Sequence, residues 1–161
     1  MRLSNRKKIS AYSFINTLLI MLMIGGIAGF ILEQYKLNIL GGEEYLFIVI
    51  PVILIIVFYI TGRQIFEYDS DGEGLHFRNT NIIPFLNKNL SDEFPKYKLI
   101  SYEIVRILFI RRLYITISSK NSGSTMLKYE ISYLTKKETN DLKFSLNKVV
   151  KANKEKDSSK Q

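Results

Sequence analysis

Two uncharged stretches, residues 12–32 and 45–62, constrain most strongly how this chain can fold. As helices they would be roughly 32 Å and 27 Å long, close to the about 30 Å hydrocarbon core of a bilayer. The first stretch is also longer than the roughly 7 to 15 apolar residues of a signal peptide. The sequence therefore predicts a transmembrane helical hairpin over residues 12–62. Neither stretch contains Asp, Glu, Lys, Arg or His, which favours an anchor over an ion or proton pathway.

The distribution of charge predicts how this hairpin is oriented. The net charge of +8 divides into +4 on residues 1–11, −2 on the loop 33–44 and +6 on residues 63–161. Lys and Arg near membrane helices stay on the cytoplasmic side. We therefore expect an integral membrane protein, of the inner membrane if the organism is bacterial, with both termini cytoplasmic and residues 1–11 as a basic tail.

Gly25 and Gly29 form a G-x-x-x-G pair in the first predicted span. Small residues at this spacing allow two helices to approach closely. The pair could form the seam of a homo-oligomer, or it could pack against the second span of the same chain. The second interpretation is favoured, because the short loop already holds the two spans together.

Residues 63–150 have the pattern of an α+β domain with an antiparallel sheet. Alternating apolar residues predict strands at 65–69 and 75–78, and Asp71-Gly72 suits the turn between them. Further strands are expected over the ranges 97–105, 113–118 and 126–133, whereas residues 79–93 are rich in turn formers and are expected to be a loop.

One C-terminal helix is predicted to cap this sheet. Thr135 and Glu138 match the T-x-x-E capping box, and apolar residues then recur at helical spacing from Lys136 to Val150. Residues 151–161 are polar, so we expect a disordered tail there.

The residues that usually carry catalysis are sparse. The chain has no cysteine and one histidine, His76, so zinc chemistry and a thiol nucleophile are not expected. Asp69, Asp71 and Glu73 resemble the first half of a calcium loop, but Thr80 stands where the bidentate glutamate should be. A hairpin turn explains them better than a cation site of an enzyme. No catalytic residue, metal site or cofactor is predicted.

The segment Arg106-Ile107-Leu108-Phe109-Ile110-Arg111-Arg112 is the main candidate for a binding site. Apolar residues between arginines suit an anionic membrane surface or a protein partner. The alternative, which is slightly favoured, is a buried strand or a strand-to-strand corner with arginines at its ends. Nucleic-acid binding is not expected, because an anionic leaflet beside the domain already accounts for its basic charge.

A two-span hairpin, the strand pair Phe66-Glu67-Tyr68-Asp69 and Gly74-Leu75-His76-Phe77, further strands and one C-terminal helix resemble a known family. It comprises small bacterial membrane proteins that carry a pleckstrin-homology-like (PH-like) domain. The resemblance implies a sheet that could form a partial barrel and a non-enzymatic module. Such a module, anchored in the membrane, would bind a protein or anionic lipid. The alternative is an accessory subunit of a transporter or channel assembly.

Overall fold

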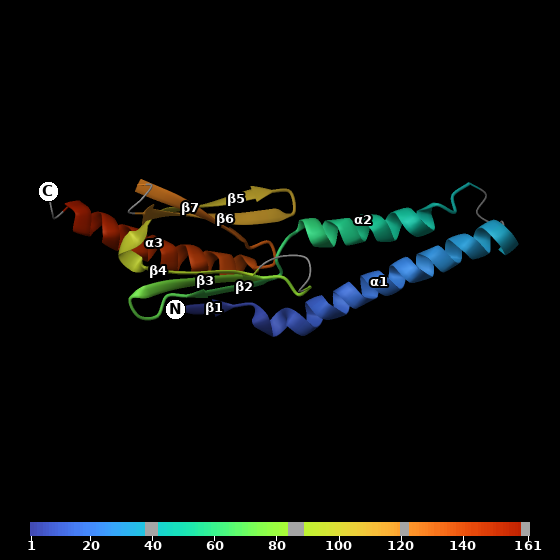
Figure 1. Ribbon diagram of the computed structural model, residues 1–161, viewed down its shortest axis with the longest axis horizontal. Helices are drawn as coiled ribbons and strands as arrows, with labels where there is room; N and C mark the ends of the chain where they lie inside the picture. The colour runs from blue at the N-terminus through green and yellow to red at the C-terminus, as the bar shows by residue number, and fades with distance from the viewer. Residues whose placement is uncertain (38–41, 84–88, 120–122, 159–161) are drawn as a thin grey trace. The chain divides into compact units, whose positions relative to one another are not determined.

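The computed structural model of this chain describes residues 1–37, 42–83, 89–119 and 123–158. It divides into two compact units. The first unit, Met1–Ile9 with Thr61–Gln161, contains all seven described strands and the C-terminal helix, whereas the second, Ser10–Ile60, contains the apolar helices. The colours of Figure 1 follow the chain through both units. The chain is therefore a mixed α and β protein with antiparallel sheets, as predicted.

Sheet A of the first unit has the order β1-β2-β3-β4, with every neighbouring pair antiparallel. Its strands are β1 (Arg2–Ser4), β2 (Ile65–Asp69), β3 (Gly74–Thr80) and β4 (Leu90–Pro95). The strands expected at 65–69 and 75–78 are thus confirmed. The loop predicted over 79–93 is wrong at its end, because Leu90–Pro95 pairs with β3 and buries Phe94 opposite Leu75. Residues 84–88 of that loop lie outside the described residues.

The N-terminal residues are not a tail, contrary to the sequence-based expectation for residues 1–11. β1 pairs with β2, and Leu3 lies opposite Tyr68 with 6% of its surface exposed. The physical reason is that the one apolar side chain of this short segment completes the buried face of sheet A. A three-residue strand offers too little pattern to be recognised alone.

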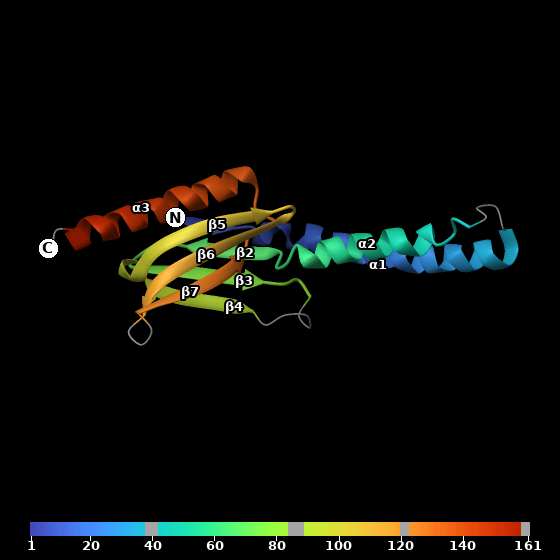
Figure 2. The same ribbon diagram turned by 90° about the horizontal axis from the view of Figure 1, so that it is seen from above.

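Sheet B consists of β5 (Leu99–Ile107), β6 (Ile110–Ser119) and β7 (Gly123–Glu130), paired in that order. A short 3-10 helix, Lys96–Lys98, connects it to sheet A. Figure 2 shows the three strands crossing over sheet A, with the C-terminal helix along one side. The strands expected at 97–105, 113–118 and 126–133 are confirmed with shifted ends. The shift is largest in β7, which ends three residues before Tyr133.

Aromatic side chains join the two sheets. The ring of Phe77 stacks on Phe94 and on Tyr129, with centroids 5.6 and 4.9 Å apart. The Tyr129 hydroxyl donates a hydrogen bond to Asp92 Oδ2 at 2.7 Å, which ties β7 to β4. Burial raises the pKa of Tyr129, and this carboxylate raises it further. The Tyr129 phenol therefore stays neutral and keeps the proton that it donates to Asp92.

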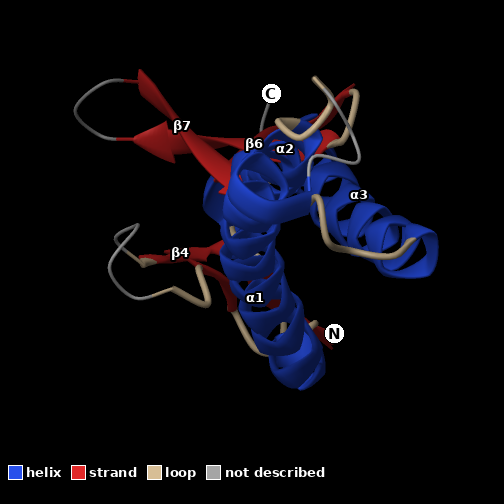
Figure 3. Ribbon diagram, turned by 90° about the vertical axis from the view of Figure 1, so that its right-hand side faces the viewer, coloured by secondary structure: helices blue, strands red, loops and turns tan. Residues whose placement is uncertain are grey.

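Helix α3 (Lys136–Ser158) covers the core from the side. Leu142 and Leu146 are fully buried, and the Ser145 hydroxyl lies 2.9 Å from that of Tyr68 on β2. The helix continues past Val150 to Ser158, so the disordered tail predicted over residues 151–161 is wrong for residues 151–158, and residues 159–161 lie outside the described residues. The Asn153 amide explains the extension, because it donates hydrogen bonds to the carbonyls of Lys96 and Leu99 at 2.7 and 2.8 Å. Figure 3 distinguishes α3 from the strands by colour.

The second unit consists of α1 (Ile9–Leu32), a π-helical turn (Glu33–Leu37) and α2 (Leu46–Ile60). By length and composition, the helical stretch Arg6–Tyr35 is long and apolar enough to cross a membrane. At 15 residues, α2 is about 22 Å long and falls short of the full hydrocarbon core.

Candidate functional site

The segment Arg106–Arg112 forms the β5–β6 hairpin rather than a buried strand. Ile107 pairs with Ile110, so the turn between the two strands consists of Leu108 and Phe109 alone. Their side chains are 82% and 72% exposed, and Ile107 is 59% exposed. The buried strand of the favoured interpretation is therefore wrong, whereas its strand-to-strand corner agrees with this hairpin. The apolar run is an exposed tip, because a two-residue turn places its side chains beyond the reach of either sheet.

Leu108 holds an unusual backbone conformation at this tip. Its φ is +51°, and it is the only non-glycine residue with a positive φ in the described part of the chain. For an L-amino acid the left-handed region costs roughly 1–2 kcal/mol, which is why glycine or asparagine usually occupies such turns. A large apolar residue here makes the turn less stable, and its 82% exposed side chain gains little burial in return.

Replacing Leu108 by Gly should stabilise the domain. The relief of backbone strain, about 1–2 kcal/mol, exceeds the roughly 0.5–1 kcal/mol of extra unfolded-state entropy that glycine brings. We expect a gain of about 0.5–1 kcal/mol. Urea unfolding of the full chain in detergent, followed by circular dichroism, would measure it. Phe109→Gly is the matched control and should destabilise, because Phe109 has no positive φ to relieve.

The three arginines of the segment do not form one basic cluster. Arg106 is exposed, Arg112 lies opposite Glu130 in the register of β6 and β7, and Arg111 turns back into the domain. The Arg112 Nε is buried without a hydrogen-bond partner among the described residues. Only Arg106 can therefore act beside the tip as a freely exposed cation.

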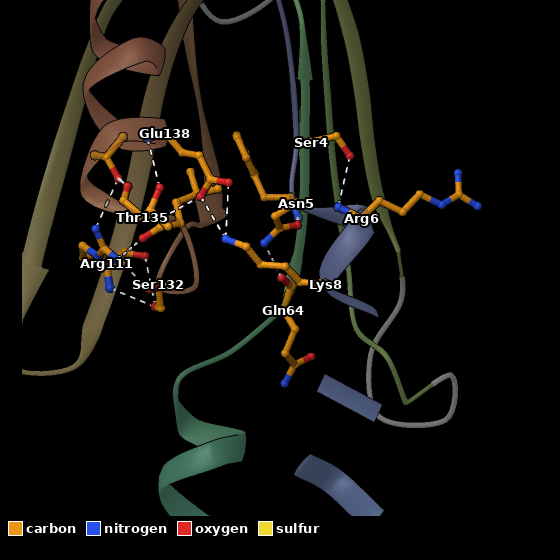
Figure 4. A network of polar contacts seen from close by, with 12 residues as sticks. Ser4, Asn5, Arg6, Lys8, Gln64, Arg111, Ser132, Thr135 and Glu138 are labelled. Atoms are coloured by element: carbon orange, nitrogen blue, oxygen red, sulfur yellow. Dashed lines mark hydrogen bonds and ion pairs between the residues drawn. The ribbon is translucent and has the colours of Figure 1, made fainter. Parts of the chain in front are cut away.

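Arg111 holds the connection between β7 and α3 (Figure 4). Its guanidinium donates hydrogen bonds to the carbonyls of Ser132, at 2.7 Å, and Leu134, and to the Thr139 hydroxyl at 3.2 Å. Its backbone N–H donates to Ser132 Oγ at 3.0 Å. Burial lowers the pKa of Arg111, and the nearby charge of Arg106 lowers it further. Arg111 is thus a structural residue and not a ligand for lipid.

Polar contacts place the hairpin tip at the end of the first unit where the chain leaves for the apolar helices. Glu130 Oε2 accepts a hydrogen bond from the Arg63 backbone N–H at 2.6 Å, and a Cβ at Gly62 would overlap this carboxylate. Glu130 is also the register partner of Arg112, three residues from Phe109. The hairpin tip therefore extends about 10 Å beyond Arg63, the point at which the chain approaches β2. Figure 2 shows the β5–β6 turn at this end of the unit.

The other exit of the chain lies at the same end. The Asn5 side chain donates to the Gln64 carbonyl at 2.7 Å and accepts from the Phe66 N–H at 2.9 Å. Lys8 Nζ then lies 3.3 Å from Glu138, whose carboxylate accepts the Thr135 N–H at 2.7 Å (Figure 4). The Thr135 hydroxyl accepts the Glu138 N–H at 3.2 Å, which confirms the predicted capping box. One carboxylate thus caps α3 and binds the segment that leads into α1.

Glu138 makes the stability of this junction depend on pH. Partial burial acts to raise the pKa of Glu138, but the Thr135 bonds and Lys8 outweigh it and hold the pKa below its ordinary value. The stabilisation is therefore present above the unfolded-state pKa of about 4.3 and is lost as pH falls through the lower folded-state pKa.

We expect Glu138→Gln, which keeps the capping oxygen but not the charge, to cost about 0.5 kcal/mol at pH 7. The unfolding curves of the two proteins should converge once the pH falls below the lowered folded-state pKa of Glu138, where the wild-type carboxylate is also protonated. Lys8→Gln is the control, since it removes the same ion pair from the other side. A difference that persisted unchanged at low pH would show that the charge is not responsible.

The acidic turn is partnered within the domain. The Asp71 N–H donates to Asp69 Oδ1 at 2.9 Å, and the Asp71 carboxylate pairs with the Met1 ammonium. His76 is exposed with Nδ1 3.4 Å from Glu93. Across the described residues, no group of three or more His, Cys, Asp or Glu side chains could hold a metal ion. The hairpin-turn interpretation of Asp71-Gly72 agrees with the φ of +70° at Gly72.

The glycines of α1 divide between two roles. A Cβ at Gly26 would overlap the Phe47 backbone oxygen on α2, and one at Gly29 would meet the Phe47 ring at 3.4 Å. A Cβ at Gly25 would meet nothing within 4 Å. The prediction that the pair packs against the second span of the same chain is therefore confirmed for Gly29 but not for Gly25. Gly26, which is not part of the G-x-x-x-G pair, makes the closest contact with α2.

Pro51 explains why Phe47 makes this contact. A proline inside a helix cannot donate to the carbonyl four residues before it, which is that of Phe47. The freed carbonyl lies against Gly26, where the absence of a side chain allows a Cα–H···O contact. Near the other end of the two helices, the Tyr59 hydroxyl donates to Asn16 Oδ1 at 3.1 Å. The paired helices are thus fixed at two levels.

Comparisons of this chain with protein-family models, with curated proteins and with solved structures found no match.

Proposed function

We propose that this protein is a membrane-anchored interaction module without enzymatic activity, whose folded domain binds a protein partner or the anionic lipid surface. The observation that carries the proposal is the pairing of β1 with β2 on either side of the apolar helices. Because these strands belong to one sheet, the segments before α1 and after α2 must lie on the same side of any membrane.

This pairing supports two membrane crossings. One crossing alone would separate β1 from β2, so α1 and α2 must either both span the bilayer or both remain outside it. The large side chains of these helices are mostly exposed, and only 6% of the most apolar part of Arg6–Tyr35 is buried. Apolar surface on this scale requires lipid or a partner. Local thinning of the bilayer would accommodate the shorter α2 at modest cost.

The side on which the domain lies is proposed from charge. Arg6, Lys7, Lys8 and Arg63 flank the helices at the domain end, which suits the cytoplasmic face of a bacterial inner membrane. The domain itself is proposed to be PH-like, because four strands in one sheet, three in the next and a final helix follow the order expected for that fold.

Labelling of single cysteines tests the topology, since the chain has none of its own. An impermeant thiol reagent, applied to intact spheroplasts and to inverted vesicles, should reach Cys at Arg2 and at Met126 from the same side. It should reach Cys at Glu43 from the opposite side. All three positions are exposed. If Glu43→Cys were labelled from the same side as the others, the proposed anchor would be wrong.

An accessory role in a transporter or channel assembly is a second candidate. A groove of about 510 Å³ beside Gly25, lined by Met21, Leu22, Gly26 and Ile50, could receive a helix of another subunit. Gly25→Leu should then dissociate a complex that is stable in mild detergent and leave the folded domain unchanged. Gly29→Leu would be unsuitable for this test, because Gly29 packs against Phe47 of its own chain.

A further inference from the structure

The side chains of the turn between β5 and β6 are left largely exposed by the described part of the chain, and we propose that this turn binds lipid. Leu108 and Phe109 insert into the headgroup and upper acyl region of the same bilayer that holds α1. This inference rests on the proposed membrane anchorage and names the lipid surface, rather than a protein, as the partner of this site.

The tip is the one place in the described first unit where large apolar side chains are exposed consecutively. Ile107, Leu108 and Phe109 follow one another, with exposures of 59%, 82% and 72%. Other exposed large apolar side chains of this unit, such as Met126 and Phe144, stand singly along the chain. Isolated exposed apolar residues are ordinary, whereas a contiguous patch indicates a contact.

The position of the tip within the unit selects the membrane as its partner. The Arg63 N–H is bonded to Glu130, and Thr61 lies two residues before Arg63. On the neighbouring strand, Arg112 lies opposite Glu130 and three residues from Phe109. The chain therefore leaves for the proposed membrane helices at the end of the unit that carries the hairpin tip, about 10 Å short of the tip itself. If α1 and α2 are in the bilayer, the chain enters the membrane from this end of the first unit.

The size of the tip favours lipid over a protein partner. Two side chains bury at most a few hundred Å², well below the about 1,000 Å² of a stable protein interface. A tethered domain needs no more than this, because the helices hold the tip at high effective concentration beside the bilayer. Arg106, exposed next to the tip, adds attraction to anionic headgroups.

The backbone of Leu108 agrees with an external role. Its φ of +51° makes leucine an unfavourable choice for the folded domain alone, and residues held in such conformations concentrate at functional sites. An apolar side chain at this position gains burial only if something outside the domain covers it. Lipid would do so for Leu108 and Phe109 together.

Tryptophan fluorescence can test the insertion, because the chain contains no tryptophan. Phe109→Trp would report from the tip, and Phe144→Trp, at a site 75% exposed on α3, is the control. Phe144 lines a groove with Gly72 of the β2–β3 turn, at the far end of sheet A from Arg63. Each full-length variant is reconstituted into vesicles of phosphatidylcholine and phosphatidylglycerol, with or without bromine in the upper acyl chains.

We expect the emission of Phe109→Trp to shift to the blue and to be quenched by lipids brominated within about 10 Å of the headgroups. Emission of Phe144→Trp should show neither effect. Adding Leu108→Asp to Phe109→Trp should reverse the shift and abolish the quenching, with the fold checked by circular dichroism.

Two results would overturn the inference. Equal quenching of the tip and control tryptophans would mean that Phe109 is not inserted. A blue shift without quenching by brominated lipid would mean that another protein surface covers the tip. Failure of the chain to float with vesicles after an alkaline wash would instead refute the proposed anchor, so the two failures are distinguishable.

Discussion

Replacing Gly26 by Ala should separate α1 from α2, whereas the same change at the neighbouring Gly25 should not. The new methyl group at Gly26 would overlap the Phe47 carbonyl, which is backbone and cannot move aside. Overpacking of this kind costs typically 1–3 kcal/mol, against a gain of about 1 kcal/mol in helix propensity. At Gly25 only the gain remains, because the space there is open. The two substitutions should therefore have opposite signs.

The distance between spin labels on cysteines introduced at Met21 and Ile53 would measure this separation. Both side chains are exposed, and the chain has no native cysteine that would take a label. We expect a narrow distribution for the parent and for Gly25→Ala, and a broad one shifted to longer distance for Gly26→Ala. Identical narrow distributions in all three proteins would contradict the role given to the carbonyl freed by Pro51.

Arg111→Ala is expected to be the most damaging single change in the folded domain. It leaves the carbonyls of Ser132 and Leu134 and the Thr139 hydroxyl without their charged donor. Hydrogen bonds to charged groups contribute about 1.5–3 kcal/mol each but are not additive, so a loss of about 3 kcal/mol is expected. Arg111→Lys should recover little, because an ammonium cannot reproduce the guanidinium fork.

Arg106→Ala is the matched control for this prediction. Arg106 lies opposite Arg111 in the register of β5 and β6, yet its side chain is exposed. Its loss should change stability by less than about 0.5 kcal/mol. Urea unfolding in detergent would compare the variants at constant pH. Equal destabilisation by both changes would mean that net charge, and not the hydrogen bonds of Arg111, is what matters.

The parts of the fold that could be predicted are those encoded by local pattern. The alternation at 65–69 and 113–118 specifies strands because one face of each is buried, and Phe66 and Leu113 are on that face. Thr135 and Glu138 cap α3 through contacts three residues apart, so their spacing alone was sufficient. The lengths of the two uncharged apolar stretches likewise indicated α1 and α2.

The parts that could not be predicted depend on partners distant in the sequence. Nothing near Arg2–Ser4 indicates a strand, because its partner β2 lies beyond both apolar helices. The three arginines of the candidate site looked equivalent, and only the hydrogen bonds of Arg111 to Ser132, Leu134 and Thr139 separate it from Arg106. Gly26, beside the G-x-x-x-G pair, and Pro51, in the second apolar stretch, were both visible in the sequence. Their contact depends on how α1 and α2 pair, which no local pattern fixes.

The early position of β1 in the chain dictates an order of assembly during synthesis. Asn5 accepts a hydrogen bond from the N–H of Phe66, which lies 61 residues later in the sequence. Sheet A therefore cannot close until both apolar helices have left the ribosome. After β2 is made and until β1 joins it, β2 would present an open edge, which is prone to pairing with other chains. Pairing of the two helices brings the segments that flank them together and reduces the entropy of closing this long loop. Slow pairing of α1 with α2 would therefore delay the folding of a domain that neither helix belongs to.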